Sequence, residues 1–326
     1  MSVPAEIDGF DAGPLGRLAL SRSAVDRATQ RRADAEWIEA AWAAPSTRVV
    51  VVHASQALAT TSDGQPELAF ISAAEAPAGT RFFLGIDDEG VAYFGVSAAA
   101  EVEPWSWSPR PDAEPISLRL AGALLSDRDA GLLTHAVALA NWHDTHTHCP
   151  KCGAATVPAP AGHITVCPVD GTEHFPRLDP AVIMLVTDPD DRCLLARNAL
   201  WPKGRMSVLA GFVEPGESAE HAVVREVFEE AAIVVGQVRY LGSQPWPMPR
   251  SLMLGYQAVA AAGQSIAVDE DEIGEARWFT RAELIEDIEA SVLSVAPTSS
   301  IARRLIEYWY GAELPDFAGS WAAPAR

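Results

Sequence analysis

Three glutamates grouped in one short stretch are the strongest candidates for chemistry in this chain. Glu226, Glu229 and Glu230 are three and four residues apart, so in an α-helix their carboxylates share one face. Three anions on one face repel one another unless a cation lies among them. Carboxylate-rich oxygen sites select Mg²⁺ or Mn²⁺ rather than Zn²⁺. A solvated acidic helix face has the same pattern, so the surrounding residues must decide between the two interpretations.

The residues before and between these glutamates predict a turn followed by an amphipathic helix. A strand is expected at 206–212, and the glycines and proline that follow it favour a turn. Ser218 is suited to cap the N-terminus of a helix. One apolar stripe is predicted to pack against a core, and it consists of Ala222, Val223, Val227 and Phe228.

The stretch that begins at Gly211 resembles the Nudix box, whose pattern is G-x5-E-x7-R-E-U-x-E-E-x-G-U. Eight of the nine specified positions match, and Ala232 stands where the family has glycine. Alanine at such a helix end costs on the order of 1 kcal/mol. Because no expected metal ligand is changed, we predict an effect on stability rather than a loss of activity. The resemblance implies an α/β/α Nudix sandwich that hydrolyses nucleoside diphosphates linked to another group.

The Nudix resemblance also implies the set of metal ligands. Besides the three glutamates, the carbonyl of Ala210 or Gly211 and the carboxylate of Glu275 are expected to bind Mg²⁺ or Mn²⁺. The acidic run at 269–272 could compete with Glu275 for this role, but we interpret it as a solvated loop.

Catalytic roles follow from the same resemblance. Hydrolysis of a pyrophosphate requires neutralised phosphate charge and an activated water. Either Glu229 or Glu230 is expected to help deprotonate that water. Arg225 is expected to pair with the glutamates and orient them, with Glu217 in the same outer shell.

A second motif, SQPWPMPRSLM from Ser243 to Met253, bears on the other half of the substrate. Taken alone, its prolines describe a stiff turn around a buried tryptophan. The stretch closely resembles SQPWPFPxS, the signature of the NADH pyrophosphatase branch of the Nudix family. Met248 replaces the usual phenylalanine, a change that conserves apolar volume. The resemblance implies cleavage of NADH or NAD⁺ to nicotinamide mononucleotide and AMP, removal of NAD caps from RNA 5′ ends, and a homodimer.

The branch resemblance also implies substrate contacts. Nicotinamide is a flat ring that needs stacking partners, and Phe175 and Phe212 match the two aromatic positions of the family. Gln244 and Ser251 match polar contacts to the mononucleotide. Ala302 matches a residue that the second subunit donates.

The cysteines predict a zinc-ribbon-like segment over residues 143–177. Cys149 and Cys152 form a CxxC turn, and fourteen residues separate Cys152 from Cys167. Two such turns at this distance resemble a zinc ribbon, in which four thiolates hold Zn²⁺. We expect any zinc here to be structural, because nothing around it resembles a substrate cleft.

The fourth thiolate of such a ribbon is missing. Asp170 stands in its place, and His174 lies four residues further on. Asp170 or His174 could complete the site, or one of the histidines His143, His146 and His148 could do so. A ribbon that persists without metal is the third alternative.

The composition limits the classes of protein to which this chain can belong. The 326 residues include 48% apolar residues, and no apolar run reaches the ~18 residues of a membrane helix. The first residues lack the basic and apolar regions of a signal peptide. Four cysteines, two of them in one CxxC, suit a reducing compartment, so we expect a cytoplasmic protein without a membrane partner. The net charge of −20 argues against general nucleic-acid binding but leaves room for one RNA end held through a metal.

We therefore predict three parts. Residues 1–142 form an N-terminal Nudix-associated α+β domain for support or dimerisation, with a hairpin at 81–96 and a helix at 127–142. Residues 143–177 form the zinc-ribbon-like segment, and residues 178–326 form the catalytic domain. Two other functions remain open: a Nudix hydrolase of ADP-ribose or dinucleoside polyphosphates, and a binding protein with a decayed active site. The complete set of glutamates argues against decay.

Overall fold

The computed structural model describes residues 13–99, 105–106 and 108–315, which form two compact units. The first unit contains Arg22–Leu178 and Trp246–Arg250, and the second contains 13–21, Asp179–Pro245 and 251–315. Each unit therefore includes one short segment whose neighbours in sequence belong to the other unit. Among the helices that the structure describes, none has both the length and the apolar character needed to cross a bilayer.

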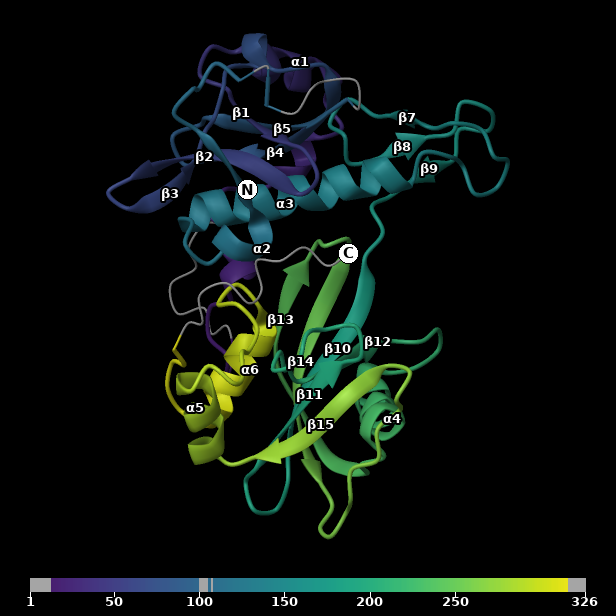
Figure 1. Ribbon diagram of the computed structural model, residues 1–326. Coiled ribbons are helices and arrows are strands. Elements are labelled where there is room, and N and C mark those ends of the chain that lie inside the picture. The colour runs from purple at the N-terminus through teal and green to yellow at the C-terminus, as the bar shows by residue number, and fades with distance from the viewer. Residues whose placement is uncertain (1–12, 100–104, 107, 316–326) are drawn as a thin grey trace. The chain divides into compact units, whose positions relative to one another are not determined.

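The second unit is built on a six-stranded mixed sheet (Figure 1). Its strands are β10 (Asp179–Thr187), β11 (Cys193–Asn198), β12 (Leu209–Phe212), β13 (Val235–Trp246), β14 (Ser251–Ala260) and β15 (Ile273–Phe279). The order is β13-β14-β10-β11-β15, and β12 pairs with β10. The long β10–β14 pair is parallel, whereas β12 and β11 are antiparallel to β10.

Helices cover both faces of this sheet. They are α4 (Ala219–Ala231), α5 (Arg281–Glu289) and α6 (Ile301–Tyr310). Successive side chains of a strand point to opposite faces, so Val182 and Met184 of β10 pack with α4 while Ile183 and Leu185 pack with α5 and α6. This is the predicted α/β/α sandwich.

The first unit contains two three-stranded sheets and the small ribbon sheet. The strands are β1 (Arg48–Val52), β2 (Gln56–Ser62), β3 (Gln65–Leu68), β4 (Gly79–Ile86), β5 (Ala92–Ala98), β6 (Glu114–Ser117), β7 (Val157–Pro158), β8 (Thr165–Val166) and β9 (Glu173–His174). The helices are α1 (Ala35–Ala43), α2 (Leu118–Ala121) and α3 (Asp127–Thr145), with 3₁₀ turns at Ala19–Ser21 of the second unit and at Thr29–Arg31 and Ala73–Glu75. The predicted β4–β5 hairpin and the predicted helix after residue 126 are confirmed.

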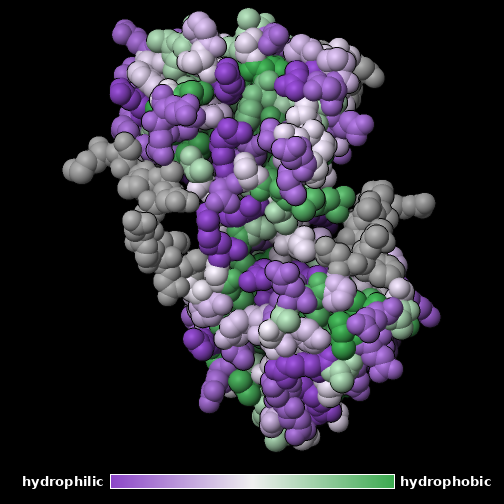
Figure 2. All heavy atoms as spheres, turned by 90° about the vertical axis from the view of Figure 1, so that its left-hand side faces the viewer, coloured by the Kyte–Doolittle hydropathy of each residue, from purple (hydrophilic) through white to green (hydrophobic). Residues whose placement is uncertain are grey.

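Hydrophilic residues cover much of the face drawn in Figure 2, and groups of apolar side chains lie between them.

The buried His163 of the first unit predicts that acid lowers the stability of the folded protein. His163 is 9% exposed, and its Nε2 lies 2.6 Å from the Phe83 carbonyl oxygen. Burial outweighs this hydrogen bond and lowers the pKa of His163 to about 4. The unfolded chain takes up a proton below about pH 6.5, whereas the native histidine does so only near the lowered value. Stability should therefore fall as the pH falls between these two values, by up to about 3 kcal/mol for this residue.

The measurement is thermal unfolding followed by circular dichroism from about pH 7.5 to about pH 4.5. His163→Gln keeps an amide donor for Phe83 but does not titrate, so its melting temperature should fall less steeply with acid. His221→Gln is the matched control, because His221 is exposed. An unchanged acid slope in His163→Gln would contradict the prediction.

Candidate active site

The box helix α4 begins and ends as its sequence predicts. The Ser218 Oγ accepts a hydrogen bond from the His221 backbone N–H at 3.3 Å, so Ser218 is the N-cap. Ala232 follows the helix in the left-handed conformation, with φ of 55°, at the position where the Nudix pattern has glycine. The predicted apolar stripe is wrong at one residue. Phe228 is 55% exposed, because the turn of the helix carries it past the edge of the packed face.

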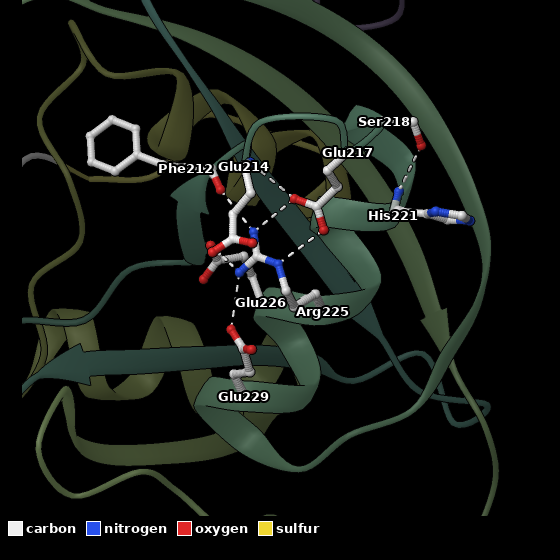
Figure 3. A network of polar contacts seen from close by, with 8 residues as sticks. All are labelled: Phe212, Glu214, Glu217, Ser218, His221, Arg225, Glu226 and Glu229. Carbon is white, nitrogen blue, oxygen red and sulfur yellow. Dashed lines mark hydrogen bonds and ion pairs between the residues drawn. The ribbon is translucent and has the colours of Figure 1, made fainter.

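Arg225 organises the polar face of this helix (Figure 3). Its Nε and Nη2 donate to the two carboxylate oxygens of Glu217, each at 2.9 Å. Its Nη1 donates to Glu226 at 2.9 Å and to Glu229 at 3.0 Å. Its Nη2 also donates to the Phe212 carbonyl at 2.9 Å. One guanidinium thus orients three glutamates and ties them to the end of β12.

Glu226 lies against the backbone of β12. A Cβ added to Gly211 would be 1.8 Å from the Glu226 Cδ, so the carboxylate occupies the space that a side chain would take. Gly211 itself is held by pairing with Val182 of β10. Burial raises the pKa of Glu226, and the charge of Arg225 opposes this shift. The neighbouring Ala210 pairs with Ile183, and its carbonyl lies in the same strand.

Glu230 is the buried member of the group, with 8% of its surface exposed. Its Oε2 is buried and has no hydrogen-bond partner among the described residues. Burial, followed by the charges of Glu226, Glu272 and Glu229, raises the pKa of Glu230 to about 8. A buried carboxylate without a partner is costly, and further carboxylates beside it raise that cost. The donor set therefore fits an oxygen-binding divalent cation.

Glu272 lies near enough to the glutamate cluster to affect its charge. Its carboxylate raises the pKa of both Glu226 and Glu230. The acidic run at 269–272, which contains Glu272, could compete with Glu275 for the metal, although the sequence favours a solvated loop there. The predicted ligand Glu275 is 51% exposed and lies 3.9 Å from Arg197 on the neighbouring strand. The sequence alone does not distinguish Glu272 from the other acidic residues of this run.

The two aromatic candidates lie in different units. Phe212, at the end of β12, is 59% exposed (Figure 3), and Phe175 of the first unit is 63% exposed. Exposed phenylalanines at these positions are free to stack on a flat ring. Ser251 is half-buried and begins β14, opposite Asp179 of β10.

Two predicted substrate contacts are buried instead. Gln244 is fully buried; its Oε1 accepts from the Leu20 N–H at 3.2 Å, and its Nε2 donates to the Ser299 carbonyl at 3.0 Å. Ala302 is 3% exposed and packs in the core beneath α6. Neither side chain is open to a ligand or a second subunit in this structure. Gln244 links three segments of the second unit that are far apart in sequence, through its hydrogen bonds to Leu20 and Ser299.

The signature turn is held by the first unit. Asn141 of α3 donates from Nδ2 to the carbonyls of Pro247 at 2.6 Å and Pro249 at 3.3 Å. The Arg119 guanidinium lies over the Trp246 ring, 5.6 Å from its centroid. These contacts explain why the turn clusters with residues far from it in sequence.

Three cysteine thiols of the ribbon segment come together. The Sγ atoms of Cys149, Cys152 and Cys167 lie within 4.8 Å of one another. Cys149 and Cys167 are buried and Cys152 is exposed. Burial would raise the pKa of Cys149, but hydrogen bonds from the Lys151 and Cys152 backbone and from His174 lower it to about 7. This donor set fits Zn²⁺, which binds thiolates.

Comparison with known families matches most of the chain. A NUDIX domain matches residues 177–297, an NADH pyrophosphatase zinc ribbon domain matches 144–175, and an NADH pyrophosphatase-like rudimentary NUDIX domain matches 46–142. The last match lies within residues 1–142, for which the sequence predicts a Nudix-associated α+β domain for support or dimerisation.

Individual relatives agree with the family matches. The NAD-capped RNA hydrolase NudC of Mycobacterium bovis is 42% identical over 303 residues, which cover 90% of this chain and 95% of that protein. The human NAD-capped RNA hydrolase NUDT12 is 41% identical over 197 residues, covering 57% of this chain and 42% of that protein. A solved NUDIX hydrolase from Nitrosomonas europaea is 18% identical, with a TM-score of 0.39 over 52% of this chain and 95% of that one.

The fold and the glutamate site define a Nudix hydrolase, and the predicted fold class is confirmed. Within this class, the chain belongs to the NudC-type NADH pyrophosphatase family, as the relative that matches nearly its whole length establishes. It is an enzyme.

Proposed function

We propose that this enzyme hydrolyses the pyrophosphate bond of NADH and NAD⁺ to nicotinamide mononucleotide and AMP, and that it removes NAD caps from RNA 5′ ends. The observation that carries the proposal is the carboxylate cluster held by Arg225, with its buried and unpartnered Glu230. The names of the relatives and the descriptions of the matching domains support the nicotinamide substrate.

We assign the divalent cation, Mg²⁺ or Mn²⁺, to Glu226, Glu229, Glu230 and either Glu275 or Glu272, with the Ala210 carbonyl as a backbone donor. Such a cation would neutralise phosphate charge and lower the pKa of water. Arg225 and Glu217 keep the carboxylates in position before substrate arrives. Glu229 or Glu230 would accept the proton from the attacking water, and Glu230 is the one we test, because no described residue engages its Oε2.

We also propose that the enzyme is a cytoplasmic homodimer. All four cysteines are free thiols, which suits a reducing compartment. Exposed apolar side chains on the second unit, such as Leu200 at 93% and Tyr240 at 49%, offer surface for a second copy. Light scattering coupled to size-exclusion chromatography will measure the mass, and a monomer at all concentrations would refute the dimer.

Analysis of the reaction products tests which substrate the enzyme cleaves. The enzyme is incubated with NADH, NAD⁺, ADP-ribose or a dinucleoside polyphosphate, with Mg²⁺, Mn²⁺ or chelator, and products are separated by chromatography. We expect nicotinamide mononucleotide and AMP from NADH or NAD⁺, and no product in chelator. Cleavage of ADP-ribose or the polyphosphate alone would favour another Nudix activity. No cleavage by folded, metal-supplied protein would favour a binding role.

NAD-capped RNA is the second substrate to test. The net charge of −20 offers little attraction for the RNA body. Decapping should therefore favour unpaired 5′ ends and depend only weakly on salt. A steep loss of decapping with salt would contradict this expectation.

Replacing Phe212 by alanine should weaken nicotinamide binding. Stacking on an aromatic side chain is worth about 1–3 kcal/mol, so we expect the KM for NADH to rise about tenfold with a smaller change in kcat. The KM for ADP-ribose, which lacks nicotinamide, should change little. Phe228→Ala is the matched control, because Phe228 is exposed to a similar degree on α4. Equal effects on both substrates would exclude a nicotinamide contact.

A further inference from the structure

The cysteine cluster of the first unit lacks one ligand for a tetrahedral zinc site. Three thiols converge, and Cys152 Sγ lies 3.5 Å from Cys167 Sγ. Structural zinc sites have four protein ligands. The two candidates for the fourth corner are Asp170, which stands at the CxxC position, and His174, four residues further along.

Asp170 already has partners for both carboxylate oxygens. Oδ1 accepts a hydrogen bond from the Thr172 N–H at 3.0 Å. Oδ2 forms an ion pair with the Lys151 Nζ at 3.0 Å. Asp170 also interacts with the Cys167 thiol. The ion pair with Lys151 links the turn after Cys167 to the turn after Cys149, so Asp170 holds the two turns together.

His174, unlike Asp170, has a polar side-chain atom without a hydrogen-bond partner among the described residues. It lies on β9 and pairs with Thr165 of β8, two residues before Cys167. This hairpin brings the imidazole to Cys149, with whose thiol the ring interacts. Its Nε2 is nevertheless buried and has no hydrogen-bond partner among the described residues. A buried ring nitrogen without a hydrogen-bond partner, on a side chain that interacts with one thiol of the cluster, suits a metal ligand.

Other histidines of the segment are less suitable. His143 is buried, and its Nε2 lies 2.8 Å from the Gly162 carbonyl oxygen. The Nδ1 of His146 lies 2.9 Å from the Thr145 hydroxyl, and that of His148 lies 2.9 Å from the Thr147 hydroxyl. Each of these rings therefore already has a partner.

We propose that His174 Nε2 completes a Cys₃His zinc site with Cys149, Cys152 and Cys167. Asp170 holds the two cysteine turns together without binding the metal. The site differs in charge from a four-thiolate ribbon, because a neutral imidazole replaces one anion. The proposal concerns the ribbon alone and does not depend on the substrate of the hydrolase.

Zinc content and X-ray absorption test the proposal in the full-length protein. We expect one zinc per chain, with three sulfur ligands at about 2.3 Å and one nitrogen at about 2.0 Å, and with the scattering pattern of an imidazole. His174→Asn should lower zinc affinity, measured by competition with a chromophoric chelator, by at least about 100-fold. Asp170→Asn should keep the zinc and its ligand set, with a lower melting temperature.

His174→Cys keeps the proposal testable if His174→Asn does not fold. If position 174 faces the metal, X-ray absorption of this variant should show four sulfurs. Three sulfurs in His174→Cys, an unchanged zinc affinity in His174→Asn, loss of zinc in Asp170→Asn, or a wild-type protein that purifies without zinc under non-chelating conditions would each overturn the assignment.

Discussion

Glu230→Gln should reduce kcat for NADH by about 1,000-fold, which corresponds to about 4 kcal/mol of transition-state stabilisation. Glutamine has the shape of glutamate but carries no charge, so it neither attracts the cation as strongly nor accepts the proton. Glu230 is 8% exposed on the packed side of α4, so water cannot readily replace the lost oxygen. Initial rates at saturating NADH with Mg²⁺ or Mn²⁺ measure the effect.

Unfolding temperatures separate this loss from a loss of fold. In chelator, the variant should melt no lower than the wild type, because a buried carboxylate without a partner has been removed. Added Mg²⁺ or Mn²⁺ should stabilise the wild type more than the variant. Glu220→Gln is the control on the same helix, since Glu220 is exposed in the first turn. A Glu230→Gln enzyme with more than about a tenth of wild-type kcat would refute the assigned role.

Gly211→Ala should reduce kcat by about 100-fold while leaving the protein folded. The added methyl group would lie 1.8 Å from the Glu226 Cδ and 2.0 Å from its Oε1. Glu226 is the end of a flexible side chain, so it can move away at small cost in stability. Its carboxylate would then leave both Arg225 and the metal position. Displacements of about 1 Å in a catalytic group cost about 100-fold in rate.

The control for this prediction is another glycine-to-alanine change. Gly236 of β13 has open space where its Cβ would be built, so Gly236→Ala should leave kcat near the wild-type value. Melting temperatures of both variants should stay within a few degrees of the wild type. A Gly211→Ala enzyme of full activity would show that Glu226 does not need its present position.

Local patterns were predictable because they depend on helix and turn geometry alone. The spacing of Glu226, Glu229 and Glu230 brings their side chains to one region of α4 in any context, and Ser218 caps that helix as expected. The turn at 87–90 likewise joins two strands that pair as predicted. The N-terminal region was predicted only as a Nudix-associated domain, and the sequence did not reveal that residues 46–142 resemble a NUDIX domain themselves, because this region lacks the box motif that identifies the catalytic copy.

Burial was not predictable residue by residue. Gln244 and Ala302 matched family positions for substrate contacts, yet the structure buries both in the second unit. Phe228 matched the apolar stripe, yet it is 55% exposed. The burial of Gln244 and Ala302 depends on which distant segments pack against them, and the exposure of Phe228 depends on where the packed face of α4 ends; a sequence pattern contains neither kind of information.

The sequence alone was enough to predict the Nudix class, the helix that carries the glutamates and the turns that carry the cysteines, since each depends on residues that are close together in the chain. The tertiary structure was needed to show which other residues lie near these groups. Glu272 acts on Glu230 from 42 positions away, and Gly211 makes room for Glu226. His174 reaches Cys149 because β8 and β9 pair in one register. Strand register and sheet packing set these distances, and they depend on the whole domain core.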